Sequence, residues 1–171
     1  GVRCIDLTPA KIGPMCIPSV NSSECLNEVN INMVSCGGQA SIPVAVAISN
    51  THRSIDYIEV VSSIASKSAG PATRLNLDEY IKTTETGLKK FSGAKKTKAI
   101  LILNPASPCI NMTTTILAKV QNPNIKALQL ELDEISKKVQ SYVPGYDLIL
   151  GPTLENDRIV IMFRIRGLGD Y

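Results

Sequence analysis

The chain has 171 residues, 44% of them hydrophobic and 4% aromatic, and carries a formal net charge of +3 at pH 7. This length suits one main domain with one sizeable core, and the shortage of aromatic residues makes that core aliphatic. The positive charge is too weak to favour nucleic acid as a partner, and the densest run of lysines, around "FSGAKKTK", is interpreted as a solvated loop.

Neither a membrane segment nor a disulfide framework is predicted. No apolar run approaches the roughly 20 residues that span a bilayer, and the opening "GVRCIDLTP" lacks the order of a signal peptide. We therefore expect a soluble protein of the reducing cytoplasm with no bound metal, because the cysteines are odd in number, widely spread and free of any Cys-x-x-Cys pair. The five cysteines are Cys4, Cys16, Cys25, Cys36 and Cys109.

The N-terminal third is predicted to lead up to a buried helix. Residues 2–20 are rich in Pro and Gly and contain no helix of useful length, whereas 22–28 can start a short one. The apolar run 29–35 predicts a buried strand that leads directly into Cys36. Residues 39–49 are apolar on nearly all sides and predict a helix packed on a sheet, in which Pro43 is tolerated only within the first turn.

The middle of the chain alternates strands and one well-marked helix. Residues 54–66 alternate with period two and predict a strand, which ends at "KSAGPATR". The stretch 76–91 predicts a helix capped by Asn76, with acidic residues in its first turn and lysines at its end. Residues 97–105 and 113–121 predict two further strands.

The C-terminal part predicts an amphipathic helix at 125–143 and strands at 146–151 and 158–167. The last strand alternates strictly, which is typical of an antiparallel strand with one face in water. The elements together predict an α+β fold, a largely antiparallel mixed sheet with helices packed on one face.

Cys36 is the candidate nucleophile. At the start of a helix its sulfur lies near unpaired amides, the helix dipole favours a thiolate, and the two following glycines leave room for a substrate. The spacing alone favours a small buried cysteine followed by a glycine turn over a nucleophile. The single histidine, His52, is predicted to lie on a surface turn, which leaves a Cys/His pair with little support.

Three stretches resemble the acylating acetaldehyde dehydrogenase family: "VNINMVSCGGQASIPVAVAIS", "SSIASKSAGPATRLNLDEYIKTTETGLKKFSGAKKTKAILILNP" and "VQSYVPGYDL". The resemblance implies a catalytic domain like that of glyceraldehyde-3-phosphate dehydrogenase-like enzymes. It implies that Cys36 becomes an acyl thioester, formed from a short-chain aldehyde with NAD and resolved by coenzyme A. It also implies a homodimer and a 4-hydroxy-2-oxovalerate aldolase as partner, in the degradation of aromatic compounds.

The resemblance places the NAD contact on one continuous segment, whose small residues let the backbone lie close to a cofactor. Its residues are Ser68, Ala69, Gly70, Pro71, Ala72, Thr73, Arg74, Leu75 and Asn76.

Two departures concern the extent of the chain. No G-x-G-x-x-G phosphate loop occurs, so residues 1–28 are interpreted as the tail of an otherwise absent nucleotide-binding domain and 29–171 as the catalytic and dimerisation domain. The chain also stops at "GLGDY", before a segment that supplies another nicotinamide contact in the family. We therefore expect the isolated fragment to be inactive in hydride transfer.

Other departures concern the site. Thr114 stands where the family has a general-base aspartate, and threonine cannot take up a proton at neutral pH. Ala72 replaces a usual glycine, and Cys109 in the same altered region is a candidate second thiol. Two alternatives stay open: a catalytically impaired module for dimerisation and aldolase docking, and a thiol redox or acyl-transfer protein that uses Cys36 without NAD.

Overall fold

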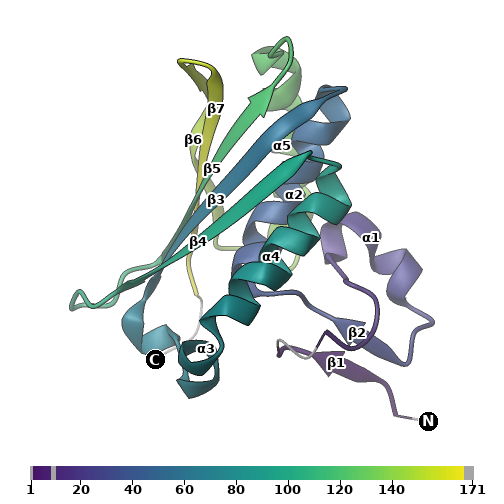
Figure 1. The fold of residues 1–171 in the computed structure, drawn as a ribbon, viewed down its shortest axis with the longest axis vertical. Helices are drawn as coiled ribbons and strands as arrows, with labels where there is room; N and C mark the ends of the chain where they lie inside the picture. The colour runs from purple at the N-terminus through teal and green to yellow at the C-terminus, as the bar shows by residue number, and fades with distance from the viewer. Residues whose placement is uncertain (1, 9–10, 168–171) are drawn as a thin grey trace.

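The computed structural model describes residues 2–8 and 11–167. In chain order the elements are β1 (Cys4–Asp6), α1 (Pro18–Cys25), β2 (Asn30–Asn32), α2 (Cys36–Thr51), β3 (Ile55–Ala65), the short 3-10 helix η1 (Ser66–Ser68), α3 (Pro71–Leu75), α4 (Leu77–Ser92), β4 (Lys96–Asn104), β5 (Met112–Val120), α5 (Ile125–Gln140), β6 (Tyr146–Glu155) and β7 (Arg158–Ile165). Figure 1 shows two layers, a five-stranded sheet of order β4-β3-β5-β7-β6 and the helices α2, α4 and α5 on one side of it.

The sheet is mixed, with mostly antiparallel neighbours. Only β3 and β4 run parallel, and α4 lies in the connection between them, as a parallel pair requires a long crossover. The pairs β3–β5, β5–β7 and β6–β7 are antiparallel. The predicted α+β fold with helices on one face of a largely antiparallel mixed sheet is therefore confirmed.

The core lies between the two layers and is aliphatic, as the composition predicts. Val60, Ile116 and Ile161 lie side by side on three neighbouring strands and are at most 1% exposed. Helix α2 is apolar on nearly all sides because α4 and α5 flank it and the sheet covers a third side. Its Ile42 and Ile48 are completely buried.

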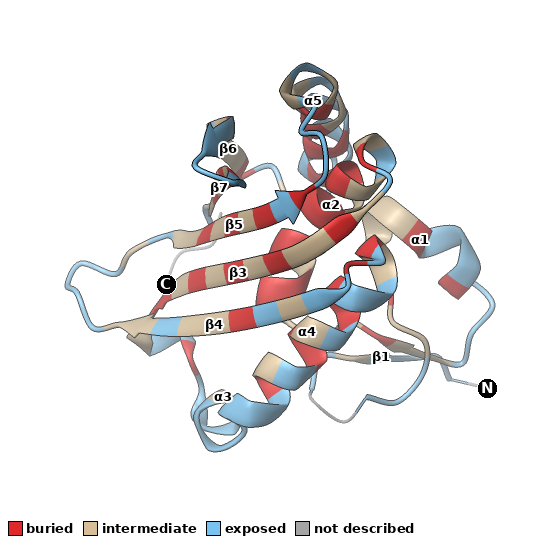
Figure 2. Cartoon of the chain, turned by 45° about the horizontal axis from the view of Figure 1, so that its top comes forward, coloured by how far each residue is buried: buried red, intermediate tan, exposed pale blue. Residues whose placement is uncertain are grey.

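On the other face of the sheet, no helix of the described residues lies over β4, β3 and β5 (Figure 2). A mostly apolar row crosses the strands on this face, and each member pairs with the next: Ile100, Val61, Thr115, Met162 and Leu150. We call this row the open face. Its members are partly exposed, whereas the residues that alternate with them on β3 are buried against the helices.

The predicted strand at 29–35 is wrong in length and in place. Strand β2 has only three residues and pairs in parallel with β1, outside the five-stranded sheet. The strand does not extend to residue 35 because Val34 has a left-handed backbone with φ of 64°, which a strand does not accommodate. The amide of Val34 donates to Oδ1 of Asn32 at 2.7 Å and so closes a tight turn before α2.

Two helix predictions also need correction. Helix α1 begins at Pro18, because proline suits the first turn of a helix, so the opening does hold a helix that begins earlier than expected. Helix α2 begins at Cys36, which places Pro43 in its interior and not in its first turn. Proline there removes one backbone hydrogen bond, and residues 40–45 around it are all buried.

Residues on both sides of position 28 contribute to one core. Ile17 precedes it and is completely buried, and Val34 follows it and is 5% exposed. Strand β1 pairs with β2 across the same position. A domain boundary after residue 28 stays a prediction.

Tyr146 connects the sheet to α2, and its removal tests that connection. Its buried hydroxyl donates to the carbonyl oxygen of Ala40 at 2.7 Å, and its ring stacks on Phe163. We expect Tyr146→Phe to lower the free energy of unfolding by about 1 kcal/mol, because the stack stays and one buried hydrogen bond is lost. Urea unfolding followed by circular dichroism measures this change. Tyr142→Phe, at a side chain 42% exposed, should change it by less than about 0.5 kcal/mol, and equal effects would contradict the assignment.

Candidate functional site

Cys36 is exposed and is the first residue of α2, which begins three residues before the predicted start at residue 39. The N-cap is Ser35, whose Oγ accepts from the Gly38 amide at 2.9 Å. The Gly37 amide donates to Tyr80 Oη at 3.0 Å. Among the described residues the Cys36 amide has no hydrogen-bond partner, so it stays available beside the sulfur.

Val34 sets the approach to this helix start. A β-branched residue rarely adopts a positive φ, and such strain occurs preferentially at functional sites. The side chain of Val34 packs close to Gly38 and Gly87, where an added Cβ would lie 2.8 and 3.2 Å from its Cγ1. The two glycines therefore let Val34 stay buried in its strained conformation, two residues before the thiol.

Tyr80 on α4 is the side chain that sequence reasoning missed. It is 8% exposed, and its Oη lies 3.6 Å from Cys36 Sγ. Burial, followed by the charge of Cys36, raises the pKa of Tyr80 far above its ordinary value, so the phenol keeps its proton at neutral pH. A signal was present, because a tyrosine on the buried side of an amphipathic helix needs a partner for its hydroxyl.

The structure brings three residues of the predicted cofactor segment together with Cys36. Ala72, Thr73 and Asn76 line a cavity of about 260 Å³ that Cys36 and Tyr80 also line. Six residues of the segment are not in its lining: Ser68, Ala69, Gly70, Pro71, Arg74 and Leu75.

Arg74 instead holds the segment in place. Its guanidinium donates to the carbonyl oxygens of Ala69 and Ser66 at 2.9 and 2.6 Å. Asn76 is the N-cap residue of α4, as predicted, but its side chain makes no cap hydrogen bond, because its amide group donates backwards to the carbonyl oxygen of Ala72 at 2.8 Å. Asn76 thereby closes the end of α3 and faces the cavity.

A second cavity, of about 180 Å³, shares only Cys36 with the first. It lies on the other side of α2, and its walls are almost entirely apolar. The lining residues are Cys36, Gln39, Ala40, Met112, Val139, Tyr142, Val143, Tyr146 and Ile165. The thiol therefore lies between a cavity with polar groups and an apolar one.

Thr114 is completely buried beneath the start of α2. Its Oγ1 lies 3.3 Å from Ser62 Oγ, which in turn lies 3.2 Å from the place of a Cβ on Gly37. A threonine here supplies a hydroxyl but no proton acceptor for the thiol at neutral pH. Cys109 is exposed in the loop between β4 and β5, and its action as a second thiol stays a prediction.

The prediction of a surface position for His52 is wrong. His52 is 6% exposed and ends α2, with Nδ1 at 3.0 Å from the Ile48 carbonyl oxygen and Nε2 accepting from the Asn124 amide at 3.0 Å. The 16-residue length of α2 separates it from Cys36 by roughly 24 Å. His52 therefore terminates the helix and connects it to α5, and it forms no catalytic pair with the thiol.

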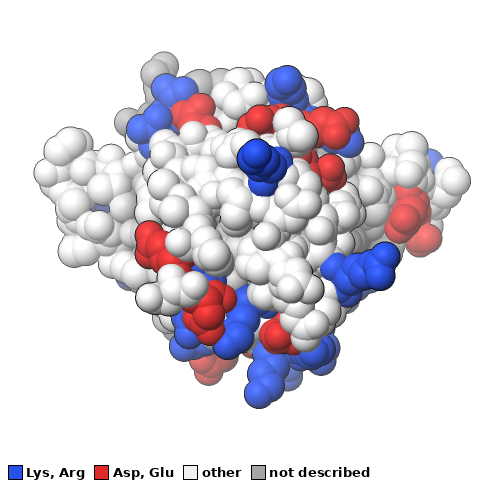
Figure 3. Space-filling view, turned by 90° about the horizontal axis from the view of Figure 1, so that it is seen from above, with Lys and Arg blue, Asp and Glu red and all other residues white. Residues whose placement is uncertain are grey.

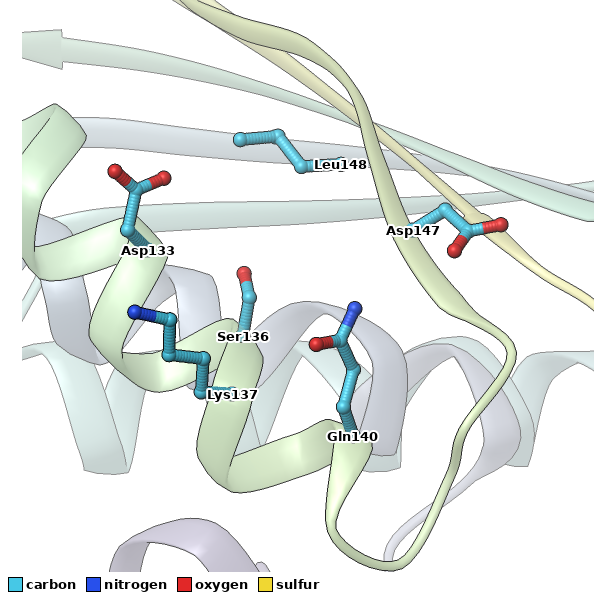
Figure 4. Close-up of a pocket in the computed structure, with 6 residues that line it drawn as sticks. All are labelled: Asp133, Ser136, Lys137, Gln140, Asp147 and Leu148. Atoms are coloured by element: carbon cyan, nitrogen blue, oxygen red, sulfur yellow. The ribbon is translucent and has the colours of Figure 1, made fainter.

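A larger cavity, of about 500 Å³, lies away from Cys36. Figure 4 shows Asp133, Ser136, Lys137 and Gln140 of α5 opposite Asp147 and Leu148 of β6. Asp147 pairs with Arg166 at 2.9 Å and with Arg164 at 3.4 Å. The cavity contains no thiol, so it offers no chemistry comparable to that of Cys36.

The surface carries both signs of charge. On the face in Figure 3, acidic and basic side chains lie interspersed around a largely uncharged centre. No helix in the described part of the chain is long and apolar enough to cross a membrane. Within residues 2–8 and 11–167, no group of three or more His, Cys, Asp or Glu is placed to hold a metal ion.

The sequence is similar to known proteins over its whole length. Residues 36–171 match the family model described as prokaryotic acetaldehyde dehydrogenase, dimerisation. The chain is 65% identical over its whole length to an acetaldehyde dehydrogenase of Spirochaeta aurantia and covers 58% of that protein. It is 59% identical over 98% of its length to one of Pectobacterium atrosepticum, of which it covers 57%. The chain thus spans little more than half the length of these relatives.

Replacement of Gly37 tests how tightly the site is packed. A Cβ at this position would lie 2.3 Å from Tyr80 Oη and 3.2 Å from Ser62 Oγ. We expect Gly37→Ala to lower the free energy of unfolding by about 1–3 kcal/mol, measured by urea unfolding. The control is Gly70→Ala, where nothing lies within 4 Å and φ is −67°, so stability should rise by about 0.4–1 kcal/mol. A Gly37→Ala variant as stable as the parent would contradict the close contact.

Proposed function

The chain belongs to the prokaryotic acetaldehyde dehydrogenase dimerisation family, and from this premise we propose that it carries the catalytic thiol of an NAD- and CoA-dependent acylating acetaldehyde dehydrogenase. One observation carries the proposal. The sulfur of Cys36 lies at the start of α2 and lines a cavity with Ala72, Thr73 and Asn76. A nucleophile and the predicted cofactor segment, more than 30 positions apart in the sequence, thus meet in one place.

The residues of the cavity fit the nicotinamide end of NAD. Ala72 leaves room for a flat ring, and Thr73 and Asn76 add polar groups to the lining. An added Cβ at the neighbouring Gly70 would meet nothing within 4 Å, so the backbone there is accessible to a cofactor. NAD would supply the acceptor for the hydride that leaves the aldehyde carbon.

The chain's own groups would carry the thiol chemistry. The thiol proton leaves to solvent, since Cys36 is exposed and Thr114 cannot accept it. The thiolate adds to the aldehyde carbon, and the oxygen that becomes negative lies beside the free Cys36 amide and the positive end of the α2 dipole. Loss of hydride leaves an acyl thioester on Cys36, and the thiol of coenzyme A attacks this thioester to release acyl-CoA.

A second candidate function rests on Thr114. Because the buried hydroxyl at this position offers no proton acceptor, the domain is alternatively a catalytically impaired module for dimerisation and for docking of an aldolase. The partners we propose for the first function are a short-chain aldehyde, coenzyme A and a second copy of the chain. The aldolase partner and a cytoplasmic location have the family resemblance as their only support.

Transfer of an acetyl group from acetyl-CoA tests the first function, because this reverse half-reaction needs no NAD. We expect intact-mass and peptide mass spectrometry to find one acetyl group on Cys36 and none in Cys36→Ala. Cys109→Ala should still carry the acetyl group on Cys36, as the parent does. Cys109 is also an exposed thiol, but it does not lie at the start of a helix. Absence of the adduct on Cys36 would contradict the first function and favour the assembly module.

The open face is the surface that we assign to the homodimer. The family description names dimerisation, and the matched residues 36–171 include all five strands of the sheet. Its row of Ile100, Val61, Thr115, Met162 and Leu150 is partly exposed, and no helix covers it on β4, β3 and β5 (Figure 2). A sheet with one apolar face gains stability when a second layer covers that face.

A charge placed in the open face should separate the dimer. We expect Met162→Lys to convert a dimer into a monomer in sedimentation-velocity measurements, because the buried charge has no partner in the interface. Leu130→Lys is the matched control, since Leu130 is 72% exposed on α5 in the helix layer. A dimer that persists in Met162→Lys but dissociates in Leu130→Lys would place the interface on the helices.

A further inference from the structure

The hydroxyl of Tyr80 is part of the thiol site, and its hydrogen bonds have a defined direction. The Gly37 amide can only donate, so Tyr80 Oη accepts from it at 3.0 Å and keeps its own proton for another acceptor. Tyr80 Oη also lies 3.6 Å from Cys36 Sγ. Because a thiolate can only accept, a hydrogen bond between Tyr80 and ionised Cys36 uses the phenol proton.

Ser35 does not take that role of acceptor in the described hydrogen bonds. Thr84 donates its proton to the Tyr80 carbonyl oxygen at 2.7 Å, so the 2.7 Å contact between Ser35 Oγ and Thr84 Oγ1 uses the proton of Ser35. Ser35 Oγ accepts from the Gly38 amide. The Ser35 side chain also forms a hydrogen bond with Tyr80 that lowers the pKa of the phenol, so it does not hold the phenol proton.

Within residues 2–8 and 11–167, no charged side chain lines the cavities around the sulfur. Cys36 lines three cavities, whose walls come from the N-terminal segment, α2, α3, α4, α5, β5, β6 and β7. Among the described lining residues, none is Asp, Glu, His, Lys or Arg. The titratable groups besides Cys36 are Tyr80, Tyr142 and Tyr146, and Tyr146 donates its proton to Ala40.

We propose that Tyr80 is a catalytic residue of this site, whose hydroxyl donates a hydrogen bond to the Cys36 thiolate. The proposal rests on the proposed function. In acyl transfer, the bond between the acyl carbon and the Cys36 sulfur breaks while the bond to the coenzyme A sulfur forms. The electron pair of the broken bond stays on the Cys36 sulfur, where Tyr80 stabilises it, and the proton of the coenzyme A thiol goes to solvent. Tyr80 keeps its own proton throughout.

The experiment measures the rate of Cys36 alkylation by iodoacetamide as a function of pH. In Tyr80→Phe the ring stays and the hydrogen-bond donor is lost, so the pH midpoint of alkylation should rise by about one unit. This corresponds to a tenfold lower acid dissociation constant of the Cys36 thiol. The rate at high pH should not fall, because a more basic thiolate is at least as nucleophilic. The matched control is Tyr57→Phe, since the Tyr57 hydroxyl donates to Glu59 on the helix-free side of β3.

The sign of the shift separates a donor from a packing residue. In Tyr80→Phe the Gly37 amide loses its acceptor and becomes free to turn to the sulfur. An unchanged or lower midpoint would therefore overturn the proposal and leave Tyr80 as an acceptor for Gly37 alone. Replacement of Tyr80 by 3-fluorotyrosine keeps the shape and strengthens the donor, so here the midpoint should fall. A rise in this variant would equally overturn the proposal.

Parallel labelling with acetyl-CoA distinguishes this inference from the proposed function. Acetylation of the parent with no midpoint shift in Tyr80→Phe would reject Tyr80 alone. A parent that is not acetylated would reject the acyl-transfer function and with it the catalytic role of Tyr80, even if the midpoint shifts. Acetylation together with the expected shifts of opposite sign in Tyr80→Phe and the fluorotyrosine variant supports both.

Discussion

The site depends on one close contact, between the backbone of Gly37 and the hydroxyl of Tyr80. A side chain at position 37 would lie 2.3 Å from Tyr80 Oη, so α2 and α4 approach this closely only because the residue is glycine. The contact also gives the second amide of α2 its hydrogen-bond acceptor. It thereby fixes the position of the thiol relative to α4 and to the α3 segment that precedes it. The cavity shared by Cys36 and Asn76 follows from this arrangement.

The sequence predicts most of the fold because its strongest patterns arise from one buried face. Apolar residues recur with the helical period around Leu128 and Leu132, and with period two around Ile159 and Phe163. All four residues are completely buried. The apolar run before Cys36 misled the prediction because burial there serves a turn and not a strand. Val34 is held at a positive φ by its packing against glycines of α2 and α4, which is a tertiary contact that no local pattern records.

The site was predicted only in part for the same reason. Cys36 is marked by the glycines beside it and by the resemblance, whereas Tyr80 lies 44 positions away on a helix whose pattern states only that it is buried. His52 was misplaced because polar neighbours in "SNTHRS" predict a surface turn. In the structure the imidazole forms hydrogen bonds with the end of α2 and with the backbone amide of Asn124, the N-cap residue of α5. Polar neighbours in the sequence therefore do not show whether a polar side chain is exposed or is buried with hydrogen-bond partners.

The position of α2 between α4 and α5 gives the thiol two different sides. On the α4 side, Cys36 lines a cavity with Thr73 and Asn76, and on the α5 side it lines an apolar cavity with Val139 and Tyr142. In the function that we propose, an aldehyde carbon bound to sulfur carries an alkyl group, a hydrogen and an oxygen, each of which needs its own surroundings. The apolar cavity of about 180 Å³ suits a short alkyl group, the polar one suits a hydride acceptor, and the Cys36 amide suits the oxygen. A buried central helix with a thiol at its first residue therefore separates these three groups without any charged side chain in the described lining of the cavities.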